Sequence, residues 1–158
     1  MRTTMIVKLT DNHVLDCILL MNKSTKDNDY PYQRNERMWI EHLCKTISKQ
    51  YESPHYLAIG NYTEDGKLRG FMLASTFRSY YNGEHIMDVK DCIVDHDYNT
   101  AFTTTRLFDH MIEHVKNHGG SRWRADSIRA DDKAEGYLNF LQKKYNATPL
   151  YGVHGKIQ

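Results

Sequence analysis

Hydrophobic residues recur at a two-fold spacing in some stretches of the chain and at a helical spacing in others. Residues 5–9 read as a short strand. Residues 14–21 and 39–50 carry apolar side chains three and four positions apart, which predicts two amphipathic helices. The polar stretch 22–28 predicts a loop after the first helix, and we expect a turn at 30–34 before the second.

The middle of the chain changes to the two-fold spacing. Residues 56–62 and 68–79 are strand-like, and the stretch between them contains Asp65 and Gly66. An Asp-Gly pair supplies the positive φ that a tight hairpin needs. After a second turn, residues 84–95 continue as a strand. These three segments predict an antiparallel meander.

The last part of the chain alternates between the two spacings. We predict a helix over 100–118, a strand over 121–128, a helix over 134–145 and a final strand or strand pair over 148–157. The complete order is β-α-α-β-β-β-α-β-α-β, an antiparallel meander followed by β-α-β-α-β. This order is typical of a mixed α/β sheet, here in a single domain over 1–158.

The charge balance excludes two classes of function. The 158 residues include 21 basic and 20 acidic side chains, a formal net charge of +1, so the excess that favours nucleic acid or an anionic membrane is missing. No apolar run approaches the roughly 20 residues of a membrane span, and we expect no export signal. The three cysteines, at positions 17, 44 and 92, lack the paired spacing of a zinc site or a redox dithiol. We therefore expect a protein of the reducing cytoplasm without a metal site.

Two short clusters offer other chemistry. His110, Glu113 and His114 fit a zinc-binding pattern, but His110 and Glu113 lie opposite the apolar side of their helix and should face solvent. Arg122 and Arg124 flank a tryptophan and could contact RNA or a coenzyme phosphate, although alternation along one half-buried strand explains them equally well.

Residues 94–104 join the meander to the next helix, whose N-terminus offers backbone N–H groups to an anion. With this order and length the chain resembles the GNAT family of acetyl-CoA-dependent N-acetyltransferases over nearly all of its residues. In that family this loop holds the coenzyme pyrophosphate through the motif Arg or Gln, two residues, Gly, one residue, Gly or Ala. Aligning Val94 and Tyr98 puts Asn99, Phe102 and Thr104 at the motif positions, so both glycines and the cation are replaced.

The resemblance implies that this loop and the preceding strand bind acetyl-CoA. Small hydroxyl side chains could donate to phosphate there, whereas Phe102 is bulky where the family needs close backbone approach. The implied coenzyme-binding residues are Cys92, Val94, Asn99, Thr100, Ala101, Thr103 and Thr104.

The resemblance also implies catalytic positions. The family's general base lies six residues before the Val94 position, which here is Asp88, on the side of the strand shared by Cys92 and Val94 if no bulge intervenes. The family's tyrosine acid is replaced by Leu141, which has no proton to donate. Tyr137, one helical turn earlier, is the substitute acid.

Two functions are compatible with these residues. The first is an acyl-CoA-dependent N-acetyltransferase that acts by direct transfer to an amine on a small molecule or a protein. Its acceptor site would include the tyrosines at 30–32 between the first two helices. The second is a catalytically inactive GNAT-fold binding or structural module, similar to proteins of bacteriophages. The expected location is the cytoplasm, or the host cytoplasm or virion for a phage protein.

Overall fold

A computed structural model describes residues 3–25, 35–126, 132–150 and 157. The chain divides into two compact units, Met1–Asp126 and Ser127–Gln158. The first unit contains the whole sheet and the helices that cover it, and the second contains one helix. The single domain over 1–158 stays a prediction.

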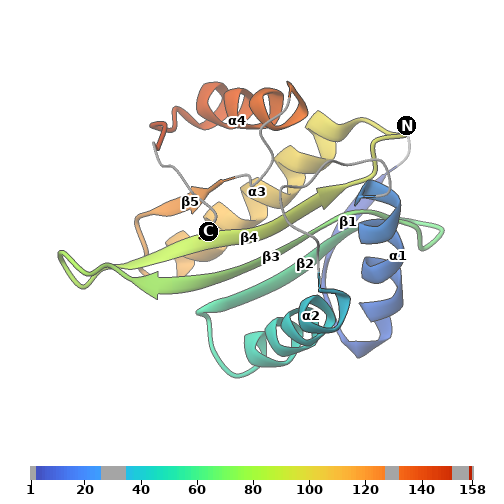
Figure 1. Cartoon of the computed structure of the whole chain (residues 1–158), viewed down its shortest axis with the longest axis horizontal. Helices are drawn as coiled ribbons and strands as arrows, with labels where there is room; N and C mark the ends of the chain where they lie inside the picture. Colours follow the sequence, from blue (N-terminus) through green and yellow to red (C-terminus); the bar gives the residue numbers. More distant parts are fainter. Residues whose placement is uncertain (1–2, 26–34, 127–131, 151–156, 158) are drawn as a thin grey trace. The chain divides into compact units, whose positions relative to one another are not determined.

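The first unit is built on a five-stranded sheet in the order β1-β2-β3-β4-β5 (Figure 1). Neighbours pair antiparallel from β1 to β4, and β5 pairs parallel to β4. This confirms the predicted mixed sheet and its meander. The strands are β1 Thr4–Lys8, β2 Tyr56–Thr63, β3 Leu68–Arg78, β4 His85–Val94 and β5 Trp123–Ala125.

Helices cover both faces of this sheet. A short 3-10 helix η1 (Asp11–His13) leads into α1 (Val14–Thr25), and α1 and α2 (Glu36–Gln50) pack on one face, called here the α1/α2 face. The long helix α3 (Thr100–Asn117) lies behind the sheet in Figure 1 and covers the opposite α3 face. Alternation along the strands therefore gives each face its own core.

Each face buries a large apolar cluster. Phe71 and Leu73 of β3 point to the α1/α2 face and pack with Leu43 and Ile47 of α2. On the α3 face, Phe108 meets Trp123 of β5 edge-on, with ring centroids 5.4 Å apart. Each fully buried side chain of this size contributes roughly 1.5–3 kcal/mol, so the two clusters supply most of the driving force for folding.

A bulge in β4 determines which side chains share a face. Leu73 pairs with Asp91 but Ala74 pairs with Val89, so Lys90 is an extra residue in β4. As a result Asp88, which pairs with Ser75, lies on the α1/α2 face together with Asp91. Cys92 and Val94 pair with Met72 and Gly70 and lie on the α3 face. The expectation that Asp88 lies on the same side as Cys92 and Val94 is wrong. The extra residue reverses the alternation between the part of β4 before Lys90 and the part after it.

The turn between β2 and β3 has the predicted hairpin geometry. Gly66 has φ of 81°, and its amide donates to Thr63 O at 3.0 Å. The Thr63 amide donates to Lys67 O at 2.9 Å and closes the loop. A glycine is favoured here because side chains rarely adopt this backbone conformation.

Helix α1 and strand β5 differ most in length from their predictions. Helix α1 continues to Thr25, so the predicted loop is helical over residues 22–25. Lys23 and Ser24 on that turn contact Asp95 and the Val94 carbonyl, and these tertiary contacts explain why polar residues stay helical. Strand β5 covers Trp123–Ala125, shorter than the predicted 121–128, of which 127 and 128 lie outside the described residues.

The second unit contains α4 (Asp132–Tyr145). Asn146, with φ of 53°, ends this helix, and the Ala147 amide donates back to Gln142 O at 3.1 Å. Residues 148–150 are not a strand, so that part of the last predicted strand is wrong; Pro149 has no amide to donate to a ladder. Residues 151–156 of the same prediction lie outside the described residues.

Candidate active site

Strand β4 loses its β5 partner halfway along its length. The two strands pair only from Met87 to Val89, and the Met87 amide donates to Arg122 O at 3.2 Å. Within the described residues, the pairing with β5 does not continue along positions 90–94. At about 3.3 Å per residue this edge is about 13 Å long. It begins at the bulge and ends at the loop that leads into α3.

Backbone groups of two predicted coenzyme-binding residues are turned toward this edge. The Asp95 amide donates to Arg69 O of β3 at 2.8 Å. Because backbone groups alternate direction along a strand, those of Val94 and Cys92 are turned away from β3. Ser24 Oγ approaches the same edge and donates to Val94 O at 3.3 Å. An extended ligand beside β4 would therefore meet the backbone of Cys92 and Val94.

Basic side chains neutralise the acidic residues of the loop after β4. Lys23 Nζ lies 2.8 Å from Asp95 Oδ1 and 2.7 Å from Asp97 Oδ2. The hydrogen bond from Lys23 lowers the pKa of Asp97. Arg69 Nη1 is 3.9 Å from Asp95 Oδ2, and its guanidinium lies over the Tyr98 ring at 3.2 Å from the centroid. Two cations thus offset the two carboxylates beside the helix N-terminus.

Helix α3 begins at the end of this loop. Asn99 is its N-cap, and the Phe102 amide donates to Asn99 Oδ1 at 3.0 Å. The first turn carries no acidic residue, so the positive end of the helix dipole is not cancelled there. The amides of Thr100 and Ala101 belong to the N-terminal groups that have no partner within the helix.

The other predicted residues of this turn have different surroundings. The side chains of Thr103 and Thr104 are buried, and Thr103 packs against Gly70 of β3. Both side chains are therefore poorly accessible to an incoming phosphate. Phe102 is 49% exposed and lies at the helix start without filling the core. Of the three predicted hydroxyl donors in this turn, Thr100 is therefore the most accessible to solvent.

Asp88 is held in a cluster of charges on the α1/α2 face. Arg124 Nε and Nη2 donate to its two oxygens at 3.1 and 3.3 Å, and Lys90 Nζ donates at 2.6 Å. Burial raises the pKa of Asp88, but the hydrogen bonds from Arg124 and Lys90 outweigh burial and hold its pKa below the ordinary value. A general base works best when its pKa is near the operating pH, and this environment moves Asp88 away from that range.

A second titratable pair lies on the same face. His42 Nε2 of α2 is 3.3 Å from Asp91 Oδ2, the first residue after the bulge. The His42 side chain is 37% exposed and that of Asp91 is 18% exposed. Sequence reasoning missed this pair, because nothing in the local pattern of α2 or β4 indicates which helix position faces which strand position.

The remaining candidates lie elsewhere. Tyr137 is half-buried on α4 of the second unit, one turn before the buried Leu141, and its role stays a prediction. His110 and Glu113 are exposed, as expected for a solvated helix face. The described part of the chain gathers no three histidine, cysteine or carboxylate side chains suited to a metal ion. It also has no helix long and apolar enough to cross a bilayer.

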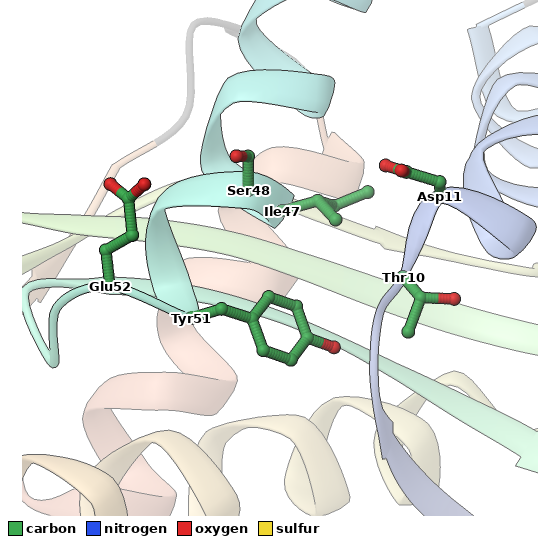
Figure 2. Close-up of a pocket in the computed structure, with 6 residues that line it drawn as sticks. All are labelled: Thr10, Asp11, Ile47, Ser48, Tyr51 and Glu52. Carbon is green, nitrogen blue, oxygen red and sulfur yellow. The ribbon is translucent and has the colours of Figure 1, made fainter.

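A pocket of about 360 Å³ lies near the C-terminal end of α2, away from β4 (Figure 2). Tyr51 reaches across it toward the end of β1 and donates to Leu9 O at 2.8 Å. Because β2 and β3 separate β1 from β4 in the sheet, this pocket is not part of the edge described above. It is lined by Thr10, Asp11, Ile47, Ser48, Tyr51 and Glu52.

Comparison with known proteins identifies the fold. The sequence matches no protein-family model and no curated protein. A mixed sheet of this order, with helices on both faces, is the fold of the GNAT acetyltransferases, and solved structures share it along the whole chain. An aminoglycoside 6'-N-acetyltransferase from Acinetobacter baumannii has a TM-score of 0.72 and 15% identity, over 99% of each chain.

Two further structures show the same likeness. A ribosomal-protein-alanine N-acetyltransferase from Brucella melitensis biovar Abortus 2308 has a TM-score of 0.69 and 16% identity, over 99% of each chain. AAC(6')-Iy, in complex with the bisubstrate analogue CoA-S-monomethyl-acetylneamine, has a TM-score of 0.70 and 12% identity, over 99% of this chain and 98% of that one. The structural likeness establishes the fold. Identities this low do not establish the activity, which has to be argued from the residues.

Proposed function

We propose that this protein is an acyl-CoA-dependent N-acetyltransferase that transfers an acetyl group directly to an amine on a small molecule or a protein. The observation that carries the proposal is the edge of β4 that runs from the bulge to the N-terminus of α3. A strand edge can pair with the amide groups of an extended ligand, and a helix N-terminus attracts phosphate. Acetyl-CoA combines these two chemical features.

Different groups would serve the coenzyme and the acceptor. The phosphates would meet the amides of Thr100 and Ala101, with Lys23 and Arg69 as the nearby cations. The backbone of Val94 and Cys92 would hold the extended arm. The α1/α2 face would then present the acceptor amine to the thioester, because the titratable side chains of β4 lie on that face.

Bound acetyl-CoA supplies an activated acetyl thioester. The amine lone pair forms a bond to the acetyl carbon, the carbon–sulfur bond breaks, and the thiolate leaves while the amine loses its proton. The family resemblance predicts Asp88 as the base. Tyr137 is the predicted acid, in place of the family's tyrosine. With Leu141 at the family's tyrosine position, Tyr137→Phe in a transfer assay tests the predicted acid.

A binding module without catalysis is the second candidate. It is supported by Phe102 at the position of the first motif glycine, and by Tyr80 and Tyr81 at the β3–β4 hairpin tip, which are 95% and 94% exposed. Exposed aromatic side chains of this kind are typical of contact surfaces for another macromolecule. A bacteriophage accessory or virion protein would belong to this candidate.

Calorimetric titration with acetyl-CoA separates the two candidates, and one residue offers a matched pair of variants. Asn99 has the extended backbone that a following proline requires, so Thr100→Pro removes one amide at the helix start with little strain. Thr100→Ala removes only the hydroxyl. We expect saturable binding to the wild type and to Thr100→Ala, and at least about tenfold weaker binding to Thr100→Pro, because a hydrogen bond to a charged group contributes about 1.5–3 kcal/mol.

The transferase proposal fails if the wild type shows no binding at millimolar acetyl-CoA. Equal affinity of Thr100→Pro and Thr100→Ala would show instead that the start of α3 does not hold the phosphates.

A further inference from the structure

His42 lies on the α1/α2 face beside the bulge of β4. Its Nε2 is 3.3 Å from Asp91 Oδ2, and Asp91 follows the extra residue Lys90. The pair therefore joins the middle of α2 to the point where β4 separates from β5. More than a third of the His42 side chain is exposed. An imidazole that solvent can reach is thus fixed at the start of the proposed coenzyme edge.

The described elements α1, α2, β4 and β5 carry further charged side chains, and most of these are directed elsewhere. Lys90 and Arg124 are directed to Asp88, whereas Asp91 is directed to His42. Among the described residues of the two helices on this face, Arg37 and Glu41 pair with each other at 3.2 Å, and Lys23 pairs with Asp95 and Asp97. Lys45 is a further cation of α2. The carboxylate that faces the imidazole is that of Asp91.

We infer that His42 is the general base of the proposed transfer and that Asp91 is its positioning residue; the inference rests on the proposed function. An alkyl amine is protonated at neutral pH and must lose a proton to attack. Asp88 is buried and engaged by two cations, whereas the His42 side chain is 37% exposed and carries a ring nitrogen that can accept a proton. Nε2 of His42 is directed to Asp91, so Nδ1 accepts the proton of the acceptor amine. This transfer accompanies formation of the C–N bond and breaking of the C–S bond, and Nδ1 then releases the proton to solvent.

The test compares two acceptors that differ in protonation. Propylamine is protonated at neutral pH and needs a base, whereas acetohydrazide is unprotonated. With acetyl-CoA as donor, His42→Ala should lower kcat/KM for propylamine by about 10²–10⁴-fold and affect acetohydrazide far less. Added imidazole should restore transfer to propylamine. Asp91→Asn should lower the same rate in the same selective way. His118→Ala, at the residue that follows α3, serves as the control.

Several results would overturn the inference. An equal loss with both acceptors in His42→Ala would indicate a structural role. Selective loss in Asp88→Asn but not in His42→Ala would assign the base to Asp88. The wild type could transfer the acetyl group to acetohydrazide alone, or bind acetyl-CoA and transfer to neither acceptor. Either result would show that no base works at this site. Absence of acetyl-CoA binding would refute the proposed function itself, whereas binding and transfer undiminished in His42→Ala would refute the inference alone.

Discussion

At the scale of single residues, the surroundings of a side chain decide its chemistry more than its position in a motif. Asp88 occupies the place at which the family resemblance puts a base, yet Arg124 and Lys90 bind both of its oxygens. Asp91, three positions later, faces a histidine instead. The sequence showed that acidic residues lie on β4, but their partners come from β5 and α2, and no local pattern reveals such pairings.

Asp88→Asn should destabilise the protein by about 1–3 kcal/mol, because Arg124 and Lys90 lose their shared counter-charge. The folded-state pKa of Asp88 is lowered, so its contribution is present above the unfolded value of about 3.9 and is lost as the pH falls through the folded value. The difference in Tm between wild type and Asp88→Asn should therefore be constant above about pH 5 and shrink in more acidic buffer.

The exposed Asp97, which pairs with Lys23, offers a control for this measurement. Asp97→Asn should leave Tm almost unchanged, because solvent screens a surface ion pair. A Tm difference for Asp88→Asn that stays the same down to pH 2 would contradict the ionised state assigned to Asp88.

At the scale of elements, spacing predicted the existence and order of most helices and strands. The alternation of β2, β3 and β4 and the helical spacing of α2 and α3 are strong because each element has a buried face. The bulge at Lys90 could not be predicted, since the residues around it fit an unbroken strand equally well. That single extra residue changed the face assigned to Asp88. The end of α1 was also missed, because contacts to Val94 and Asp95 stabilise it.

The packing of α3 on β3 gives a second prediction. A Cβ added at Gly70 would lie 2.6 Å from Thr103 Cγ2 and 3.1 Å from Ile93 O. Gly70→Ala should therefore cost about 1–3 kcal/mol, or about 2–4 °C in Tm per kcal/mol. Thr103→Ser removes the methyl group that would collide.

The double variant tests the contact itself. Gly70→Ala with Thr103→Ser should be more stable than the sum of the two single effects predicts, because the added methyl group occupies the space that the removed one leaves. Strictly additive changes in Tm would contradict the close approach of α3 to Gly70, and with it the inward orientation of the Thr103 side chain.

At the scale of the molecule, the two halves of the proposed reaction meet at β4. The groups proposed to bind the coenzyme lie along the part of β4 beyond its pairing with β5 and at the start of α3, and the titratable groups lie on the α1/α2 face. The element order alone predicted the fold that the solved acetyltransferases share. The loop motif could not predict the cations beside this loop, because Lys23 and Arg69 come from other elements.

The most direct test of this account is an NMR titration of the uniformly ¹⁵N-labelled protein with acetyl-CoA. We expect the largest amide shifts at Cys92 and Val94 on β4 and at Thr100 and Ala101 on α3, with little change at the pocket of Thr10 and Tyr51. Shifts confined to that pocket, or no shifts at millimolar acetyl-CoA, would contradict the claim that the edge of β4 and the start of α3 form the coenzyme site.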